Sequence, residues 1–580
     1  MATPSPSFNV ATLRQLKRIV LPFFTSEKRH KARGLLALLI SFSLCVAWVN
    51  VLMSYALRDV MSALAERRGV EFTRQLWIYL GTFALAIPLA GFYRYAEERL
   101  ALLWRQWMTH HLVKRYFFRR AYYHLRSSEE VDNPDQRIAE DVRNFTTMLL
   151  SLVLIIVNSL INLVAFFSVL WLISLTLVGV LFLYTLVGTV VAWLIGRRLV
   201  GLNYRQYERE ATFRYSLIRV RDNAESIAFF RGEKREHRDL ILRFRDVYDN
   251  MLHIITWNRN LHFFTTGYNY LAMALPVIVV APLYLSGKVQ FGVIPQAAGA
   301  FATVLAATSL IITQFERLSQ FTAGLARISG LWNALSEDDP EESLDEQAEQ
   351  IAVTEEGQRL ILSDLDVQTP KGEKTLVRQL DLVVKRGESI VLMGESGAGK
   401  SSLLRTIAGL WSTGSGAIQR PPLNLLMFLP QKPYMVPGSL RDQLLYPGAE
   451  DPGEERLREV LEQVNLPMLF KRVEGDLDRD VDWGNVLSLG EQQRVSFARL
   501  LLRKPVIAFL DEATSALDEP NEERLYRILR DLRIAYLSVG HRSTLKLYHD
   551  RLLYLESNGR WKLEKIEAEE PSPEPQSARN

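Results

Sequence analysis

The sequence has a single cysteine, Cys45, and almost no imbalance of charge. One cysteine excludes an internal disulfide framework and any zinc site built from several cysteines. Among 580 residues, 69 Lys and Arg oppose 65 Asp and Glu, which leaves a net charge of +4. A dedicated nucleic-acid binder usually has a clear basic excess, so we expect no nucleic-acid partner. Cys45 lies within an apolar run and is expected to be a buried thiol.

The N-terminal segment, residues 1–33, lacks the pattern of a cleavable secretory signal. Its cations, from Arg14 to Arg33, precede an apolar run at about 34–57. That run exceeds the roughly 20 residues that a membrane helix needs. A signal sequence has a shorter apolar core and ends in small residues at a cleavage site. We therefore interpret residues 1–33 as cytosolic and 34–57 as the first membrane span.

Long apolar runs dominate residues 34–330 and predict a helical membrane domain. Two long segments between the spans are rich in Lys and Arg, which marks the cytosolic side of a membrane protein. These segments keep helical periodicity, so we expect the spans to continue into the cytosol as long helices over 100–123 and 204–252. Asn158 and Asn162 share one helix face, and we favour helix-to-helix contact over a polar pathway. The six predicted spans are 34–57, 76–96, 147–172, 175–196, 264–286 and 290–314.

The second half of the chain has a different character. An acidic linker is expected over 331–355, a soluble α/β domain over 356–566, and a disordered tail rich in Pro, Glu and Ser over 567–580. The predicted fold class is therefore an α-helical membrane domain followed by an α/β phosphate-loop ATPase domain.

A glycine-rich loop joins an apolar strand, Ser389–Met393, to a helical start at Ser402. Such a loop places backbone N–H groups around phosphate oxygens at the positive end of a helix. Lys400 is expected to contact the β- and γ-phosphates, and Ser401 to bind Mg²⁺. The predicted loop residues are Gly394, Glu395, Ser396, Gly397, Ala398, Gly399, Lys400, Ser401 and Ser402.

A second apolar strand, 506–510, ends in the two carboxylates Asp511 and Glu512. Phosphoryl transfer depends on charge neutralisation and in-line positioning more than on covalent chemistry. Asp511 is therefore expected to hold Mg²⁺, and Glu512 to orient and activate the attacking water. A strand that ends in two acids can be purely structural, but the preceding phosphate loop favours the catalytic interpretation.

The segment Leu487–Arg494, Leu-Ser-Leu-Gly-Glu-Gln-Gln-Arg, resembles the signature motif of ABC-transporter ATPases. The resemblance implies that Ser488 and Gly490 contact the γ-phosphate of an ATP bound by the opposite subunit. It also assigns Gln431 to the Q-loop, where it would be a catalytic residue and a Mg²⁺ ligand. Ser515–Asp518 resembles the D-loop, and His541 resembles the catalytic switch histidine.

The resemblance is closest to subfamily D, the peroxisomal fatty-acyl type, and its bacterial BacA-like and YddA-like relatives. Leu489 stands where many ABC proteins have glycine, and the loop segments 133–138 and 225–233 also resemble that group. The polar turns near 132–141 and 225–236 are the expected coupling loops between the two halves. One departure is Thr369, which occupies the position where many ABC ATPases stack an aromatic ring on adenine, so the adenine contact is not identified.

One chain holds six predicted spans and one ATPase domain, so its signature motif needs a second chain. The simplest solution is a homodimer that uses ATP and Mg²⁺ to move cargo through a lipid bilayer. We expect bulky hydrophilic cargo, such as peptides or cobalamin-like compounds, and a bacterial plasma membrane with the ATPase domain in the cytoplasm. Transport of long-chain fatty acyl-CoA or another lipid is the alternative. A membrane-anchored ATPase without cargo and a nucleotide-regulated passive channel are rival classes.

Overall fold

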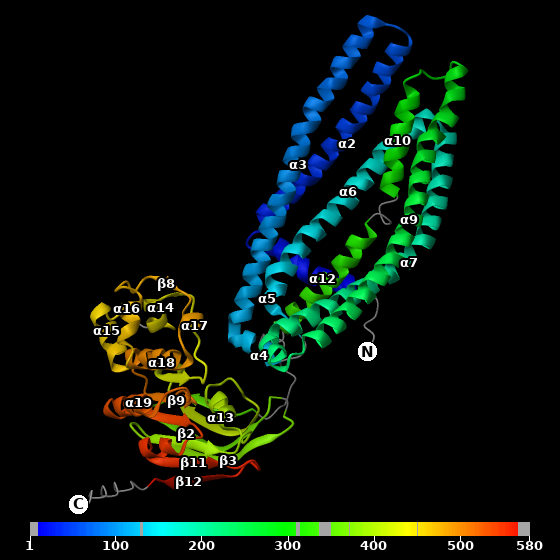
Figure 1. Ribbon diagram of the computed structural model, residues 1–580. Helices are drawn as coiled ribbons and strands as arrows, with labels where there is room; N and C mark the ends of the chain where they lie inside the picture. The colour runs from blue at the N-terminus through cyan, green and yellow to red at the C-terminus, as the bar shows by residue number, and fades with distance from the viewer. Residues whose placement is uncertain are drawn as a thin grey trace, which may run out of the picture. The chain divides into compact units, whose positions relative to one another are not determined.

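The computed structural model describes residues 10–127, 131–308, 314–335, 350–370, 372–448 and 450–566. The chain divides into two compact units, Met1–Leu344 and Asp345–Asn580, and each is described by itself (Figure 1). The predicted acidic linker and the predicted disordered tail lie mostly outside the described residues, as do Met1–Asn9 and the end of the sixth predicted span.

The first unit, the membrane unit, is helical in its described residues. Four helices are long and apolar enough to cross a membrane, and shorter apolar stretches, Leu175–Val191 and Val293–Thr308, lie at the fourth and sixth predicted spans. Its helices are α1 (Val10–Thr25), α2 (Arg29–Ala65), α3 (Gly69–Phe117), η1 (Phe118–Arg120), α4 (Ala121–Ser127), α5 (Pro134–Gln136), η2 (Arg137–Asp141), α6 (Val142–Ile173), α7 (Leu175–Asp222), α8 (Ala224–Phe230), α9 (Glu233–Leu285), α10 (Val293–Thr308) and α12 (Phe315–Ala334).

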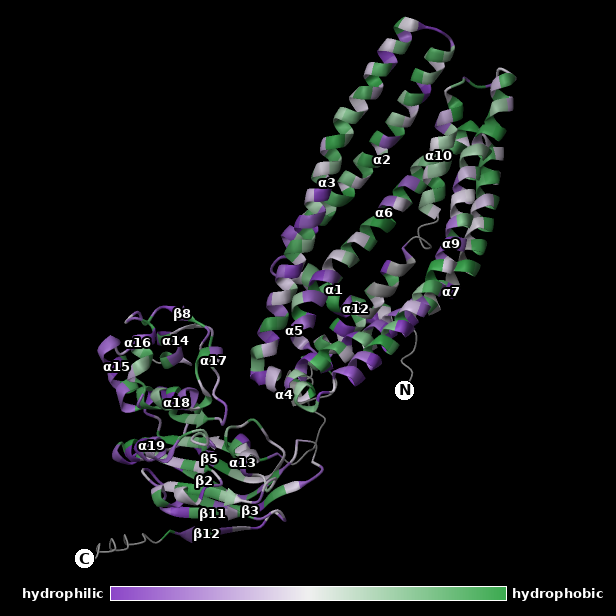
Figure 2. Cartoon of the chain, in the orientation of Figure 1, coloured by the Kyte–Doolittle hydropathy of each residue, from purple (hydrophilic) through white to green (hydrophobic). Residues whose placement is uncertain are grey.

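The long helices extend well beyond the apolar runs that predict them. At 1.5 Å per residue, the 53 residues of α9 span about 80 Å, whereas a bilayer core is about 30 Å thick. Figure 2 shows hydrophobic residues along the upper parts of α2, α6 and α10, and more hydrophilic residues at the lower ends of α7 and α9. The predicted continuation of the spans as long helices is therefore seen in α3, α7 and α9.

Two details of this unit differ from the sequence-based expectation. The helix predicted over 204–252 is broken, because Asn223 ends α7 and Arg231 adopts a left-handed backbone with φ 54° at the end of α8. Cys45 is exposed on α2, so the prediction of a buried thiol is wrong. A membrane helix that is apolar all round does not reveal from its sequence which face packs inward.

The second unit is an α/β domain built on two sheets. A six-stranded sheet has the order β12-β11-β4-β10-β9-β6, and a four-stranded sheet has the order β1-β5-β2-β3. Its strands are β1 (Ala352–Glu355), β2 (Leu360–Gln368), β3 (Thr375–Val384), β4 (Ser389–Gly394), β5 (Gly414–Arg420), β6 (Leu426–Leu429), β7 (Gly438–Ser439), β8 (Asp480–Val481), β9 (Ile507–Asp511), β10 (Ala535–Val539), β11 (Arg551–Leu555) and β12 (Trp561–Lys565).

The central strands of the larger sheet run parallel, so their carboxyl ends meet at one edge. β10 pairs with β4 on one side and with β9 on the other, and all three strands are built mainly from buried apolar residues. Ligands of open α/β sheets bind outside these carboxyl ends. The helices of this unit are α13 (Lys400–Ile407), η3 (Leu423–Leu425), α14 (Leu440–Leu445), α15 (Glu454–Gln463), α16 (Pro467–Arg472), α17 (Trp483–Val486), α18 (Leu489–Arg503), α19 (Glu519–Asp531) and η4 (Ser543–Tyr548).

Candidate nucleotide site

The loop between β4 and α13 needs glycine at fixed positions. Gly394 has φ 148°, and a Cβ there would lie 2.1 Å from the carbonyl oxygen of Leu555. Gly399 has φ 94°, and a Cβ there would lie 2.9 Å from the Cβ of Leu376. Side chains are therefore excluded on steric grounds at both ends of the loop. The backbone can turn sharply and direct its N–H groups toward a bound anion.

Lys400, the first residue of α13, folds back over this loop. Its ammonium donates to the carbonyl oxygens of Gly394 at 2.9 Å and of Glu395 at 2.8 Å. Burial lowers the pKa of Lys400, while the neighbouring Glu512 and Asp511 charges oppose that shift. The structure therefore places a cation at the mouth of a loop suited to phosphate.

Asp511 and Glu512 lie at the carboxyl end of β9. In the sheet, β10 separates β9 from β4, the strand that leads into the glycine-rich loop. The Ser401 hydroxyl donates to Asp511 Oδ1 at 3.0 Å, so the predicted magnesium-binding pair is in contact. Burial raises the pKa of Asp511, because its carboxylate is withdrawn from water. Mg²⁺ is commonly held by one or two protein oxygens together with substrate phosphates and water. The Ser401 and Asp511 oxygens fit such an ion.

Glu512 is the centre of a second group of predicted residues. Gln431 Nε2 donates to one Glu512 carboxylate oxygen at 2.7 Å, and His541 Nε2 lies 3.5 Å from the other. Glu512 itself has a left-handed backbone with φ 50°, and its amide donates to the carbonyl oxygen of Val539 at 3.0 Å. The carboxylate is thus held between two side chains from distant parts of the chain. The side chain of Gln431 therefore contacts Glu512, and it does not contact the predicted magnesium-binding pair Ser401 and Asp511.

Gln493 joins these elements, although no role for it was predicted from the sequence. Its amide nitrogen lies 3.0 Å from the Gln431 carbonyl oxygen and 3.4 Å from that of Glu512, and its oxygen accepts from the Ala516 amide at 3.1 Å. The residue is fully buried. Its place three residues after Gly490 in the signature segment was a signal that could have identified it. Gln493 positions the Q-loop and the D-loop relative to Glu512.

The signature residues do not join this group. Ser488 is an exposed N-cap of α18, and its hydroxyl and the Glu491 side chain form a reciprocal capping box. Burial alone would raise the pKa of Glu491, but the Ser488 amide and the Arg472 guanidinium together lower it. Gly490 packs against the D-loop, since a Cβ there would lie 2.9 Å from the Ala516 carbonyl oxygen. Within the described residues, the recorded side-chain contacts of Ser488 remain in its own helix.

Two further predictions can be compared with the structure. Thr369 closes a turn, because its hydroxyl accepts from the Lys374 amide at 3.2 Å, and the adenine contact stays unassigned.

In the membrane unit, Asn158 Nδ2 donates to the hydroxyl of Tyr93 on α3 at 2.8 Å. Asn158 therefore makes the helix-to-helix contact that the sequence favoured.

Comparisons with known proteins agree with both halves of this structure. Residues 18–285 match the family model described as ABC transporter transmembrane region 2, and residues 377–515 match the ABC transporter model. An uncharacterised ABC transporter ATP-binding protein of Synechocystis sp. is 44% identical over 97% of this chain and 86% of its own. ABC transporter D family member 2, chloroplastic, of Arabidopsis thaliana is 39% identical over 98% and 91%.

Two more matches extend the comparison. The human lysosomal cobalamin transporter ABCD4 is 31% identical over 96% of this chain and 96% of its own. A bacterial Atm1-family ABC exporter with ATP bound shares the fold at a TM-score of 0.71 and 18% identity, over 93% of this chain and 96% of that one. The predicted fold class and the predicted resemblance to subfamily D are both confirmed. The chain belongs to the ABC transporter family, as a half-transporter whose ATPase activity is coupled to transport across a membrane.

Proposed function

We propose that two copies of this chain form a homodimeric transporter in which each ATP lies between two ATPase domains. The observation that carries this proposal is the position of Ser488. It is exposed at the N-terminus of α18, where backbone N–H groups and a hydroxyl are available to an anion. The residues that contact one another around Glu512 and Asp511 do not include it. A second chain provides the site that this helix terminus completes.

In this proposal, each residue around the glycine-rich loop has a separate task. The backbone of Gly394–Gly399 encloses the phosphates, and Lys400 neutralises charge on the β- and γ-phosphates. Glu512 accepts the proton of the attacking water at one of its two carboxylate oxygens, of which one faces Gln431 and the other faces His541. Gln431 and His541 fix the orientation of that carboxylate, and His541 also contacts the γ-phosphate. Electrostatic positioning of this kind supplies most of the catalysis in phosphoryl transfer.

Mg²⁺ would be held by Ser401 and Asp511, with Gln431 as the further ligand that the sequence predicts. When bound, the ion neutralises charge on the phosphate oxygens. Ser401 and Asp511 are already 3.0 Å apart, so the protein oxygens need little rearrangement. Burial raises the pKa of Asp511, and a bound cation would oppose that shift by stabilising the ionised carboxylate.

The proposed cargo is bulky and hydrophilic, of the peptide or cobalamin-like class, and the proposed location is a bacterial plasma membrane with the ATPase domain in the cytoplasm. The name of one relative, a lysosomal cobalamin transporter, supports a hydrophilic cargo. Transport of long-chain fatty acyl-CoA or another lipid remains the second candidate. Stimulation of ATP hydrolysis by cargo in proteoliposomes separates both from an ATPase that transports nothing.

A mixture of two inactive variants tests the shared site. One chain carries Lys400→Ala and the other carries Ser488→Arg. In the mixed dimer, one site contains both substitutions, and the other combines the intact Lys400 and the intact Ser488. If one intact site can turn over alone, mixing restores part of the ATPase activity. If each chain used its own signature motif, both sites in the mixed dimer would be defective.

Cross-linking distinguishes the remaining outcomes. A chain with Ser488→Cys and Cys45→Ser is mixed with one carrying Ser396→Cys and Cys45→Ser, so that the native thiol does not react. The shared-site arrangement predicts a cross-link between chains that forms in the presence of ATP. A cross-link without restored activity would show that both sites must be intact. If mixed dimers are verified by pull-down but neither a cross-link nor restored activity is seen, the proposed shared site is refuted.

A further inference from the structure

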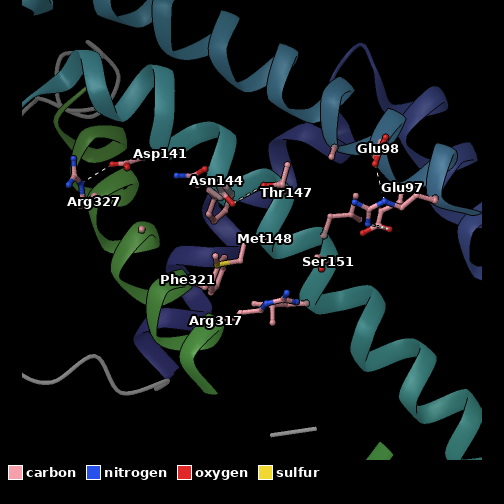
Figure 3. Close-up of a pocket in the computed structure, with 16 residues that line it drawn as sticks. Glu97, Glu98, Asp141, Asn144, Thr147, Met148, Ser151, Arg317, Phe321 and Arg327 are labelled. Carbon is pink, nitrogen blue, oxygen red and sulfur yellow. Dashed lines mark hydrogen bonds and ion pairs between the residues drawn. The ribbon is translucent and has the colours of Figure 1, made fainter. Parts of the chain in front are cut away.

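A cavity of about 760 Å³ opens between α3, α6 and α12 of the membrane unit (Figure 3). Its lining includes Glu97 and Glu98, at the end of the second predicted span, and Met148, near the start of the third. The cavity therefore lies where the predicted spans reach the cytosolic side. Its volume is that of a small-molecule or peptide pocket rather than of a site for a single ion.

Six charged side chains line the cavity, and they do not pair one to one. Arg94 donates to Glu97 at 3.2 Å and to Glu98 at 2.9 Å, so one guanidinium serves two carboxylates. On the opposite side of the cavity, Arg327 forms an ion pair with Asp141 at 2.8 Å. Two carboxylates of α3 therefore share one guanidinium, which leaves α3 with one excess negative charge at the cavity.

Arg317 on α12 is the corresponding unmatched cation. Its recorded hydrogen bond goes to the neutral side chain of Gln314, at 3.3 Å, and no carboxylate of the described residues forms an ion pair with it. The side chain lines the cavity, as Figure 3 shows. The cavity thus has a free positive group on α12 and an excess negative group on α3.

An apolar wall completes the lining of the cavity. Phe145 and Met148 on α6 and Phe321 on α12 line the same cavity. Phe145 and Phe321 stack with ring centroids 5.6 Å apart, so this wall is held rigidly by aromatic packing. A ligand that fits must present an anionic group, a cationic group and apolar surface.

We propose that this cavity binds a zwitterionic, partly apolar cargo, of which a short peptide with free termini is the type. Its carboxylate pairs with Arg317, its ammonium pairs with Glu97 and Glu98, and its side chains cover the partly exposed Met148. This inference rests on the proposed transport function and narrows its cargo. A fatty acyl-CoA carries several negative charges and no compensating cation, so it would meet repulsion at Glu97 and Glu98.

The test uses the full-length protein in nanodiscs and the tripeptide Ala-Phe-Ala, with calorimetric measurement of binding. Three forms are compared: free termini, amidated C-terminus and acetylated N-terminus. Either blocked form should bind wild type on the order of 10- to 100-fold more weakly, the usual effect of losing a charge-assisted contact. Arg317→Ala should bind the free and the amidated peptide equally, whereas Arg317→Lys should still prefer the free carboxylate.

The matched control for Arg317→Ala is Lys288→Ala, which removes an exposed cation between α9 and α10 that does not line the cavity. Lys288→Ala should leave peptide affinity and basal ATPase activity unchanged. For the ammonium, Glu97→Gln combined with Glu98→Gln should bind the free and the acetylated peptide equally. Equal binding of all three peptides to wild type would overturn the inference, because neither charge would then be recognised.

The same experiment separates this inference from the proposed function. Wild-type protein that hydrolyses ATP faster with cargo other than the tripeptide, but does not discriminate between the three peptides, would refute only the cavity assignment. A fatty acyl-CoA that binds through Arg317 and is unaffected by Glu97→Gln and Glu98→Gln would also refute the zwitterionic class. Loss of cargo-dependent hydrolysis with every compound would refute the proposed function itself.

Discussion

Replacing Glu512 by glutamine isolates the proton-accepting step from the shape of the site. Gln431 Nε2 donates to Glu512 Oε2 at 2.7 Å, and a glutamine oxygen can accept the same hydrogen bond. The side chain is 28% exposed and the backbone is anchored by the Val539 carbonyl oxygen, so neither volume nor position needs to change. The substitution therefore removes the basic oxygen and one negative charge, and leaves the surrounding contacts in place.

The expected loss of turnover follows from that single change. Removing a general base typically slows a reaction by about 10²–10⁴-fold. This range corresponds to an increase in the activation free energy of about 3–5 kcal/mol. ATP affinity should be retained or should rise slightly, because the lost carboxylate carries the same sign of charge as the γ-phosphate.

The assay is single-turnover hydrolysis of bound ATP, with nucleotide affinity measured separately by equilibrium binding. Glu523→Gln is the matched control, since it removes a half-exposed carboxylate of α19 whose recorded partner is Arg527. That control should hydrolyse ATP at the wild-type rate. Wild-type turnover in Glu512→Gln would refute the assignment of the base. Loss of ATP binding in Glu512→Gln would instead show that the carboxylate has a structural task.

Three further outcomes are expected. Lys400→Ala should weaken ATP binding by at least about tenfold, because a charge-assisted contact to phosphate is lost, and equal affinity would contradict its role. Gly490→Ala should lower ATPase activity, because its Cβ would lie 2.9 Å from a D-loop carbonyl oxygen, whereas Gly484→Ala should not, because its Cβ would lie 3.6 Å from the Asp482 carboxylate. Burial lowers the pKa of His549 to about 4, so the unfolded state binds its proton first as pH falls. The unfolding free energy should therefore fall by about 3 kcal/mol between pH 7 and pH 4 from this residue, and His549→Gln should remove that part in denaturant titrations.

The parts of the site that sequence reasoning identified are those with a local pattern. The glycine spacing before Lys400 and the two acids after β9 each follow a strand, and parallel strands bring their carboxyl ends together. The contact between Ser401 and Asp511 was therefore predictable, although 110 positions separate them. The role of Gln493 was not, because its partners are set by how three separate loops pack.

The membrane unit shows the same limit in another form. Apolar length predicted the helices, since a bilayer sets the number of residues that a span needs. It did not predict that Cys45 is exposed, or that the segment 204–252 turns at Arg231. Gly232, which follows the left-handed Arg231, was a signal for that turn, because glycine commonly follows a helix end. Arg94 pairs with Glu97 and Glu98 within α3, at spacings that the sequence displays. That α3, α6 and α12 bring these charges and Arg317 to one cavity has no signature in any one of the helices.

The capping box at Ser488 has a consequence for how ATP could join two chains. A serine hydroxyl has one proton, and here the Ser488 hydroxyl donates it to the Glu491 carboxylate, with 3.0 Å between the two oxygens. Donation to a γ-phosphate would require the hydroxyl to rotate away from that acceptor, so the two bonds exclude each other. The free energy that this hydroxyl contributes to closing the proposed dimer is then the difference between two hydrogen bonds rather than the whole of one. A small difference makes the closed state easy to reopen once the γ-phosphate has been released, which suits a machine that must cycle.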